Sequence, residues 1–215
     1  CVPSTGWLGI LTYMIQTDDN IAGVGGNLFE NNRHEPADRY RAKHMNQSWG
    51  EVGLKNPSFL FGANALYRRA AISKVGYYDR VFRTNGEDVD MCAKLRSHGY
   101  DLVYEPRAFA YHHRKDDVAS VLRMNWQHWR HPYVFYKPHQ SLRDVFQFLK
   151  IMCGLVWCNF KEDLAERDFA RAGISLLSIF NIPFRELRSY FDNPKAQIGE
   201  APSNPAVVRK AEEVG

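Results

Sequence analysis

Apolar residues in the first half of the chain recur with two different periods. Trp7, Leu11 and Ile15 follow one another at helical spacing, while later short apolar runs are bounded by glycine, proline or asparagine, as strands are. The pattern predicts helices at 5–16, around 40–47, at 70–75 and at 87–98, and strands at 21–29, 57–61, 65–67, 101–104 and 108–112. Strands separated by helices indicate an α/β layer, which is the fold class that we expect.

The second half of the chain is helical in character. From Asp116 onward the apolar spacing predicts helices at 117–131, 142–158, 161–180 and 183–191. Residues 193–215 are rich in proline, alanine and charge and show no apolar period, which predicts a mobile tail. We therefore divide the chain into an α/β domain at 1–136, a helical appendage at 137–192 and the tail at 193–215.

One apolar run, Val145 to Trp157, raises the question of a membrane. Its 13 residues include Gln147 and Lys150, so it is too short and too polar to span a bilayer. A buried core helix is the interpretation that we favour. The alternative is a peripheral membrane contact through 142–158, with an apolar stripe lying on the lipid surface. The stripe would consist of Phe146, Leu149, Met152 and Val156, with Arg143 and Lys150 near its edges.

Composition and charge narrow the classes of function. Of the 215 residues, 45% are hydrophobic and 24% are charged, which is usual for a globular protein with a real core. The formal net charge of +4 is too small to argue for binding to nucleic acid, so we expect no nucleic-acid partner. No signal-peptide pattern opens the chain, and the four cysteines lack the C-x-x-C spacing of a zinc site. We therefore expect reduced thiols in a cytoplasmic protein.

An acidic helix start is the first candidate for chemistry. Glu87, Asp88 and Asp90 directly follow the turn dipeptide Asn85-Gly86. Asp88 heads a stripe that continues with apolar residues at i+3, i+4 and i+7, so it is expected on the inward face of the helix. Acidic residues in a first helical turn are also favoured by the helix dipole, and a plain acidic helix start is the alternative interpretation.

A basic and aromatic segment is the second candidate. Between residues 118 and 143 there is no Asp or Glu. On a helix, Arg123, Gln127 and Arg130 would share one face, and Trp126 and Trp129 would lie on the adjoining one. Guanidinium groups beside indole rings suit a diphosphate or a stacked sugar ring. The alternative is a solvated basic face whose tryptophans are core anchors.

The dipeptide His112-His113 closes a predicted strand. Adjacent residues on a strand point to opposite faces, so at most one of the two imidazoles can face a given site. One histidine together with carboxylates from elsewhere could complete a metal site.

Taken together, five segments resemble the C-terminal half of a family 2 glycosyltransferase of GT-A fold. Their order and spacing match that family over about residues 1–136. The five segments are Phe61-Gly62-Ala63-Asn64-Ala65-Leu66-Tyr67-Arg68-Arg69, Val75-Gly76-Tyr77-Tyr78-Asp79, Glu87-Asp88-Val89-Asp90-Met91-Cys92, Leu95-Arg96-Ser97-His98-Gly99-Tyr100, and Tyr104-Glu105-Pro106 with His112 six residues later. The resemblance implies part of a GT-A, Rossmann-like sheet followed by a helical C-terminal appendage.

The resemblance also implies an activity and roles for some residues. A sugar would pass from a nucleotide-sugar donor to the hydroxyl of a glycan or lipid-linked acceptor, as in polysaccharide biosynthesis. Asp88 would be the general base on that hydroxyl, with Glu87 beside it, because a positioned carboxylate makes a hydroxyl a better nucleophile. The Gly62-Ala63-Asn64 loop would line the donor-sugar and acceptor pocket.

Further positions follow from the same resemblance. His112 is similar to a histidine that joins the metal or the diphosphate in some members. Arg123, Gln127 and Arg130 lie where processive members carry Gln-x-x-Arg-Trp, and this sequence reads Trp126-Gln127-His128-Trp129-Arg130. We therefore predict these residues, with Trp126, as substrate-binding positions.

The family's nucleotide-binding half, with its Asp-x-Asp metal motif, would precede Cys1. A divalent Mg or Mn ion would be held mostly there, so we expect the present chain alone to be a poor catalyst. The whole enzyme would be cytoplasmic and could work at the inner face of the membrane. The competing hypothesis is a non-catalytic module that binds carbohydrate or anions. Its contact surface would be Trp126, Trp129, Arg123 and Arg130.

Overall fold

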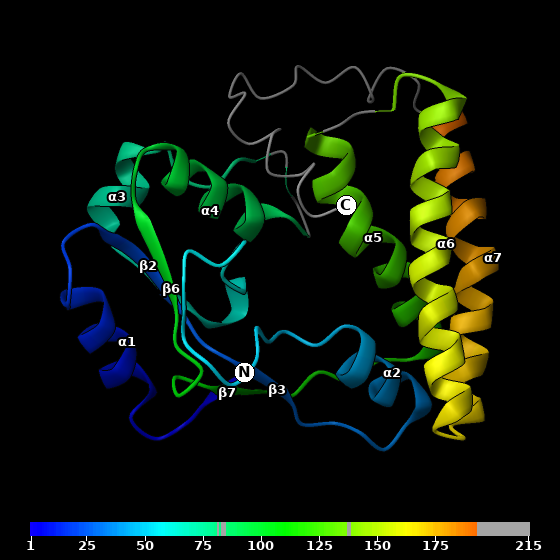
Figure 1. Cartoon of the computed structure of the whole chain (residues 1–215), viewed down its shortest axis with the longest axis horizontal. Helices are drawn as coiled ribbons and strands as arrows, with labels where there is room; N and C mark the ends of the chain where they lie inside the picture. The colour runs from blue at the N-terminus through cyan, green and yellow to red at the C-terminus, as the bar shows by residue number, and fades with distance from the viewer. Residues whose placement is uncertain (81, 83–84, 137–138, 193–215) are drawn as a thin grey trace. The chain divides into compact units, whose positions relative to one another are not determined.

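The computed structural model of the chain describes residues 1–80, 82, 85–136 and 139–192 (Figure 1). Within the last turns of the helix that ends at Tyr136, the side chains of Trp129, 131–133 and 135–136 are also outside the description. The tail predicted at 193–215 lies outside the described residues. The described chain forms two compact units: residues 1–31 with 46–114, and residues 32–45 with 115–192.

Two small mixed sheets form the frame of the first unit. In the four-stranded sheet, β2 (Ile21–Gly25) and β6 (Asp101–Tyr104) run parallel in the centre. The edge strands β5 (Ala65–Tyr67) and β4 (Leu54–Lys55) are antiparallel to β2 and β6 respectively. The three-stranded sheet has the order β1 (Val2–Pro3), β7 (Ala110–His112) and β3 (Leu28–Glu30). The α/β class predicted for this part of the chain is confirmed.

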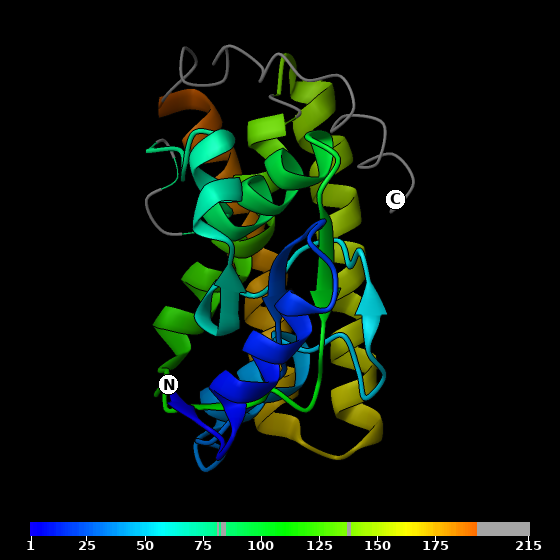
Figure 2. The ribbon, with the colours of Figure 1, turned by 90° about the vertical axis from the view of Figure 1, so that its left-hand side faces the viewer.

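Helices cover both faces of the four-stranded sheet, as the two views of the ribbon show (Figures 1 and 2). Leu102 and Tyr104 of β6 pack in a core with α4 (Glu87–Ser97) and α3 (Arg69–Lys74), whereas Val103 between them packs with α1 (Trp7–Gln16). Alternate side chains of a strand point to opposite faces, so this division follows from the β6 sequence. The packing of α4 against Leu102 and Tyr104 holds the acidic first turn of this helix in a defined position relative to the sheet.

The second unit consists of helices. These are α2 (Pro36–His44), α5 (Val118–Tyr136), α6 (Leu142–Ala165) and α7 (Phe169–Asp192). A capping box starts α6, in which the Asp144 carboxylate accepts from the Ser141 N–H and the Ser141 hydroxyl accepts from the Asp144 N–H. Helices α6 and α7 share a core around Phe148, Met152 and Ile182. None of the described helices has the length and apolar content that a membrane span requires.

Several predicted boundaries are wrong. The strand predicted at 21–29 is interrupted after Gly25, because the backbone of Gly26 must pass close to the carbonyl oxygen of Ala108. The run predicted as a strand at 57–61 is irregular, since the Leu60 N–H is hydrogen-bonded to Cys92 Sγ at 3.2 Å and none of the described strands pairs with it. Sequence periodicity does not detect either contact, because both partners are distant in the chain.

The helical half also differs from its prediction. The helix predicted to end at 131 continues as α5 to Tyr136, and the predicted break between 158 and 161 is absent, since α6 runs on to Ala165. Pro183 lies inside α7 and does not end it. By contact, α5 and residues 32–45 group with the helical unit, although we placed them in the α/β domain.

The apolar run at 145–157 is a core helix, as we favoured. Leu149, Met152 and Val156 of the stripe considered for membrane contact are buried against α7. Phe146, the fourth member, has 60% of its surface exposed. Three of the four residues are therefore unavailable to a lipid surface.

The close approach at Gly26 generates a stability prediction. A Cβ at this position would lie 1.7 Å from the Ala108 carbonyl oxygen, which is backbone and cannot move aside. We expect Gly26→Ala to lower the free energy of unfolding by about 3 kcal/mol or more. A Cβ on Gly9, inside α1, would meet nothing within 4 Å, so Gly9→Ala should stabilise by about 0.5–1 kcal/mol. Urea denaturation of both variants measures the difference, and equal stabilities would contradict the close packing.

Candidate functional site

Asp88 joins two segments that are far apart in sequence. It lies in the first turn of α4, after Gly86, whose φ of 96° is the left-handed conformation that favours glycine. Its Oδ2 accepts a hydrogen bond from the Gly62 N–H at 3.0 Å, and its Oδ1 accepts one from the Val89 N–H at 2.9 Å. A carboxylate oxygen can accept more than one hydrogen bond, so both oxygens keep acceptor capacity. The carboxylate is thus oriented and still able to take a proton.

The loop that holds Asp88 is the predicted Gly62-Ala63-Asn64 segment, which forms a single 3₁₀ turn. A Cβ on Gly62 would lie 3.3 Å from Asp88 Cβ, so glycine allows the two backbones to approach. Gly62 and Ala63 are exposed and lie beside the carboxylate. The structure therefore brings together Asp88 and two of the three predicted pocket-lining residues.

Asn64 has a different role from the one predicted. Its side chain is 1% exposed, and its Nδ2 donates at 2.8 Å to the carbonyl oxygens of both Asn27 and Ala108. Its Oδ1 accepts from Trp7 Nε1 at 2.7 Å. Both donors and the acceptor oxygen are thus used inside the protein. The prediction that Asn64 binds substrate is corrected: it positions the loop.

The other two carboxylates of the acidic helix start have distinct surroundings. Asp90 is buried and its Oδ2 lies 2.7 Å from Lys94 Nζ, an ion pair within α4. The Glu87 Oε2 is buried, and none of the described residues donates a hydrogen bond to it. A buried carboxylate oxygen without a donor is costly, which distinguishes Glu87 from its ion-paired neighbour. Asp90, by contrast, is a structural residue.

Tyr78 is a neighbour that we did not predict as a site residue. Burial raises the pKa of its hydroxyl, and the charges of Asp88 and Glu87 raise it further. A phenol with a raised pKa stays protonated at neutral pH and remains a hydrogen-bond donor. The available signal was the position of Tyr78 in the second resembling segment, but no spacing rule connects it to Glu87 across the intervening loop.

His112, the last residue of β7, and His113, which follows it, have different partners. The His112 Nδ1 lies 2.9 Å from the Oε1 of Glu30, its register partner on β3, and Glu30 is 6% exposed. His113 is exposed and its Nδ1 lies 3.3 Å from Asn31 Nδ2. A histidine whose Nδ1 faces a carboxylate presents Nε2 to a metal, the usual arrangement around a ligating imidazole. Among the described residues no group of three or more His, Cys, Asp or Glu could hold a metal by itself.

Two members of the predicted anion-binding face are instead part of a buried polar cluster. Glu186 of α7 is fully buried, and its Oε2 accepts from Trp126 Nε1 at 2.7 Å and from Arg130 Nε at 3.0 Å. His139 Nε2 lies 3.2 Å from Glu186 Oε1. Burial alone raises the pKa of Glu186, but the hydrogen bond from His139 and the charge of Arg130 outweigh burial and lower it.

This cluster corrects part of the prediction for residues 123–130. Arg130 has a buried counter-charge, so it is not available to a diphosphate, and the Trp126 N–H is also used. Arg123 is exposed and Gln127 is partly exposed, so their roles in substrate binding stay predictions. The Trp129 side chain lies outside the described residues. In the competing hypothesis of a binding module, Arg130 and the Trp126 N–H would likewise be engaged by Glu186 and not by the ligand.

Comparison with known proteins agrees with the resemblance. The sequence matches the family described as Glycosyl transferase family group 2 over residues 8–187, which covers parts of both compact units. Two proteins named pre-mycofactocin glycosyltransferase, from the CDC 1551 and H37Rv strains of Mycobacterium tuberculosis, are each 30% identical to it over 124 residues. The matched segment is 55% of this chain and 26% of the length of either relative.

The cluster around Glu186 generates a prediction with a defined pH dependence. Because the folded state lowers the pKa of Glu186, its contribution to stability is present above the ordinary value of 4.5 and is lost as the pH falls through the lower, folded-state pKa. We expect Glu186→Gln to lower the free energy of unfolding at pH 7 by about 3 kcal/mol, since Arg130 loses its buried partner. The difference from wild type should shrink below pH 4.5.

Denaturation at several pH values measures this dependence. Glu162→Gln is the matched control, because Glu162 is an exposed residue of α6 and should change stability by less than about 0.5 kcal/mol. A loss for Glu186→Gln that is small at pH 7, or that grows as the pH falls, would contradict the account of the cluster.

Proposed function

The chain belongs to Glycosyl transferase family group 2, and we propose that it supplies the acceptor side of a sugar-transfer site with Asp88 as the general base. The observation that carries the proposal is the hydrogen bond from the Gly62 N–H to Asp88 Oδ2, which fixes the carboxylate beside an exposed loop. The matched segment spans about a quarter of the length of the curated relatives. The nucleotide-binding part of the site is therefore assigned to residues outside these 215.

The proposed reaction moves one proton and one sugar. The acceptor hydroxyl oxygen bonds to the anomeric carbon of the donor sugar, and the bond from that carbon to the diphosphate breaks. The hydroxyl proton passes to the Asp88 carboxylate, and the nucleoside diphosphate leaves with the bonding electrons. General-base assistance by a positioned carboxylate typically accelerates such a step by about 10²–10⁴-fold.

The surroundings of the three carboxylates support Asp88 over its neighbours. Asp90 is paired with Lys94 and buried, which removes it from contact with an acceptor. Glu87 keeps a buried oxygen, and its burial separates that oxygen from an acceptor, whereas the partly exposed Asp88 can take the proton.

A divalent Mg or Mn ion belongs to the proposed site, and His112 is the residue of this chain that fits it. Glu30 is placed to accept a hydrogen bond from the Nδ1–H of His112, which would leave Nε2 for the ion. The remaining ligands are assigned to the part of the site outside these residues. When bound, such an ion offsets the negative charge that develops on the leaving diphosphate.

The donor in this proposal is a nucleotide-sugar, in accordance with the family. The acceptor is a hydroxyl group of a glycan or of a lipid-linked molecule, and the reaction takes place in the cytoplasm. The name of the relatives refers to transfer onto pre-mycofactocin. We carry over from it only the class of reaction, because the matched segment is a minor part of those proteins.

Replacing Asp88 tests the assignment of the base. In a protein that contains the whole transfer site, Asp88→Asn should lower kcat by about 10²–10⁴-fold, because the amide cannot take the proton, while the Kd of the nucleotide-sugar stays unchanged. Initial rates and calorimetric titration of the donor measure the two quantities. Asp101→Asn is the matched control, since Asp101 contacts Lys55 and Asn56 on the sheet edge and should leave kcat unchanged. A near wild-type kcat for Asp88→Asn would refute the proposal.

The metal assignment has its own test. Glu30→Gln should weaken Mn²⁺ binding by about tenfold or more, because the carboxylate that orients His112 is lost, and His112→Ala should weaken it at least as much. His113→Ala is the control, since His113 follows the end of β7, is exposed and contacts Asn31 instead of Glu30. Titration of the complete protein with Mn²⁺, followed by the electron paramagnetic resonance of the free ion, measures affinity independently of activity. Equal affinities for all three variants would exclude His112 from the site.

A further inference from the structure

Helix α7 carries an apolar stripe that none of the described residues covers. Its six large apolar side chains have between 43% and 71% of their surface exposed. They are Phe169, Leu176, Leu177, Phe180, Phe184 and Phe191. Single exposed apolar residues are normal, but a row of them along one face of a 24-residue helix indicates an interaction surface.

Helix α6 adds a second stripe to the same side. Phe146 and Trp157 are 60% and 50% exposed, and each directly follows a residue of the shared core, namely Val145 and Val156. On α7, Phe180 and Phe191 likewise follow Ile179 and Tyr190, which pack against that core. One residue step turns a helix by about 100° in a fixed sense. Helices α6 and α7 run antiparallel across the short link 166–168. On each helix, the residue that follows a core residue is therefore turned toward the same side of the helix pair.

Basic side chains border this apolar face on both sides. On α6, Arg143, Lys150 and Lys161 are exposed and lie within about 60° of Phe146 around the helix axis. On α7 the border toward α5 holds Arg185 and Arg188. A second copy of the chain would place like charges opposite one another at both borders, which disfavours self-association. A surface that is negatively charged and accepts apolar groups complements the face.

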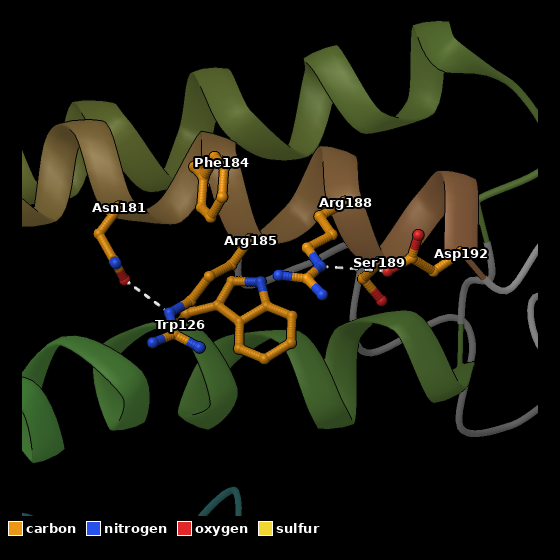
Figure 3. A pocket seen from close by; sticks show the side chains of 7 residues that line it. All are labelled: Trp126, Asn181, Phe184, Arg185, Arg188, Ser189 and Asp192. Carbon is orange, nitrogen blue, oxygen red and sulfur yellow. Dashed lines mark hydrogen bonds and ion pairs between the residues drawn. The ribbon is translucent and has the colours of Figure 1, made fainter.

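A pocket lies on the α7 border, between α7 and Trp126 of α5 (Figure 3). Its volume is about 360 Å³. The Arg185 guanidinium is held over the Trp126 ring, 5.9 Å from the ring centroid, and its Nε donates to Asn181 Oδ1 at 2.9 Å. Phe184 lines the pocket and belongs to the apolar stripe, so the pocket opens next to the stripe.

The charged groups in this pocket suit a phosphate. Arg188 is 70% exposed and pairs with Asp192 at 3.2 Å, and such an exposed pair contributes little free energy that a competing anion would have to offset. Arg185 and Arg188 both line the pocket and supply guanidinium donors, which phosphate oxygens accept, and Ser189 adds a hydroxyl.

We propose that the exposed face of α6 and α7 binds the surface of an anionic lipid bilayer, with the two helices lying along it and a lipid phosphate seated between Arg185 and Arg188. Phenylalanine and tryptophan side chains enter the boundary between headgroups and acyl chains, and the basic borders contact phosphates. The surface is formed mainly by α7, and so differs from the α6 stripe considered from the sequence. The proposal does not depend on the sugar-transfer reaction.

Sedimentation with sucrose-loaded vesicles tests the proposal on the 215-residue chain. We expect the protein to sediment with phosphatidylcholine vesicles that contain phosphatidylglycerol and to stay in solution with pure phosphatidylcholine. Phe180→Ser combined with Phe184→Ser should weaken binding by about tenfold or more through the lost apolar contact. Lys150→Gln combined with Arg188→Gln removes one charge from each border and should weaken it by about tenfold or more.

Matched controls come from the first unit. Tyr13→Ser removes a side chain that is 68% exposed on α1, close to the 69% of Phe180, and Arg69→Gln removes an exposed charge on α3. Both should bind like wild type, and all replaced residues are surface residues, so thermal unfolding should be unchanged.

Four results would overturn the proposal. The first is wild-type protein that sediments with neither kind of vesicle, and the second is wild-type protein that sediments equally with both kinds. Inorganic phosphate that binds in calorimetry as tightly as the vesicles do would assign the pocket to a free anion. A dimer in sedimentation equilibrium that Phe180→Ser with Phe184→Ser converts to a monomer would assign the face to a second copy.

Discussion

The buried amide of Asn64 is the contact on which the candidate site depends. It ties together the break after β2, the turn before β7 and helix α1, through its bonds to Asn27, Ala108 and Trp7. These bonds fix the end of the loop whose first residue, Gly62, donates to Asp88. A carboxylate at the start of a helix becomes useful for catalysis only when its position is set to within a fraction of an ångström. In this protein that position comes from a loop, held by one amide, and from the packing of α4 on the sheet.

The part of the site that lies in single elements can be predicted from the sequence. Asp88 at the head of an inward stripe and His112 at the end of a strand both follow from local period, and the structure places them in α4 and β7 as expected. The role of Asn64 could not be predicted in this way, because its partners lie 37, 44 and 57 residues away. The same holds for Arg130, whose face was predicted correctly as helical but whose counter-charge, Glu186, is 56 residues distant.

Helix boundaries and surfaces show the same limit. Periodicity identified the helical half, but it predicted a helix end at 158, where α6 continues to Ala165. Packing of α6 on α7 outweighs a weak local helix propensity. It also assigned Leu149, Met152 and Val156 to a stripe that could face lipid. A stripe of apolar residues is the same pattern whether it meets another helix or a membrane. Only the pairing of α6 with α7 shows that the exposed stripe is one residue step away, at Phe146, Trp157, Phe180 and Phe191.

In the proposed reaction the Asp88 carboxylate accepts the proton of the acceptor hydroxyl. Chemical rescue tests it most directly: in a protein with the complete transfer site, the transfer rate of Asp88→Ala is measured with increasing concentrations of formate. We expect a very slow variant whose rate rises with formate concentration, because the small carboxylate enters the space left by Asp88 and takes the proton. A variant that is as fast as wild type without formate, or a slow one that formate does not accelerate, would contradict it.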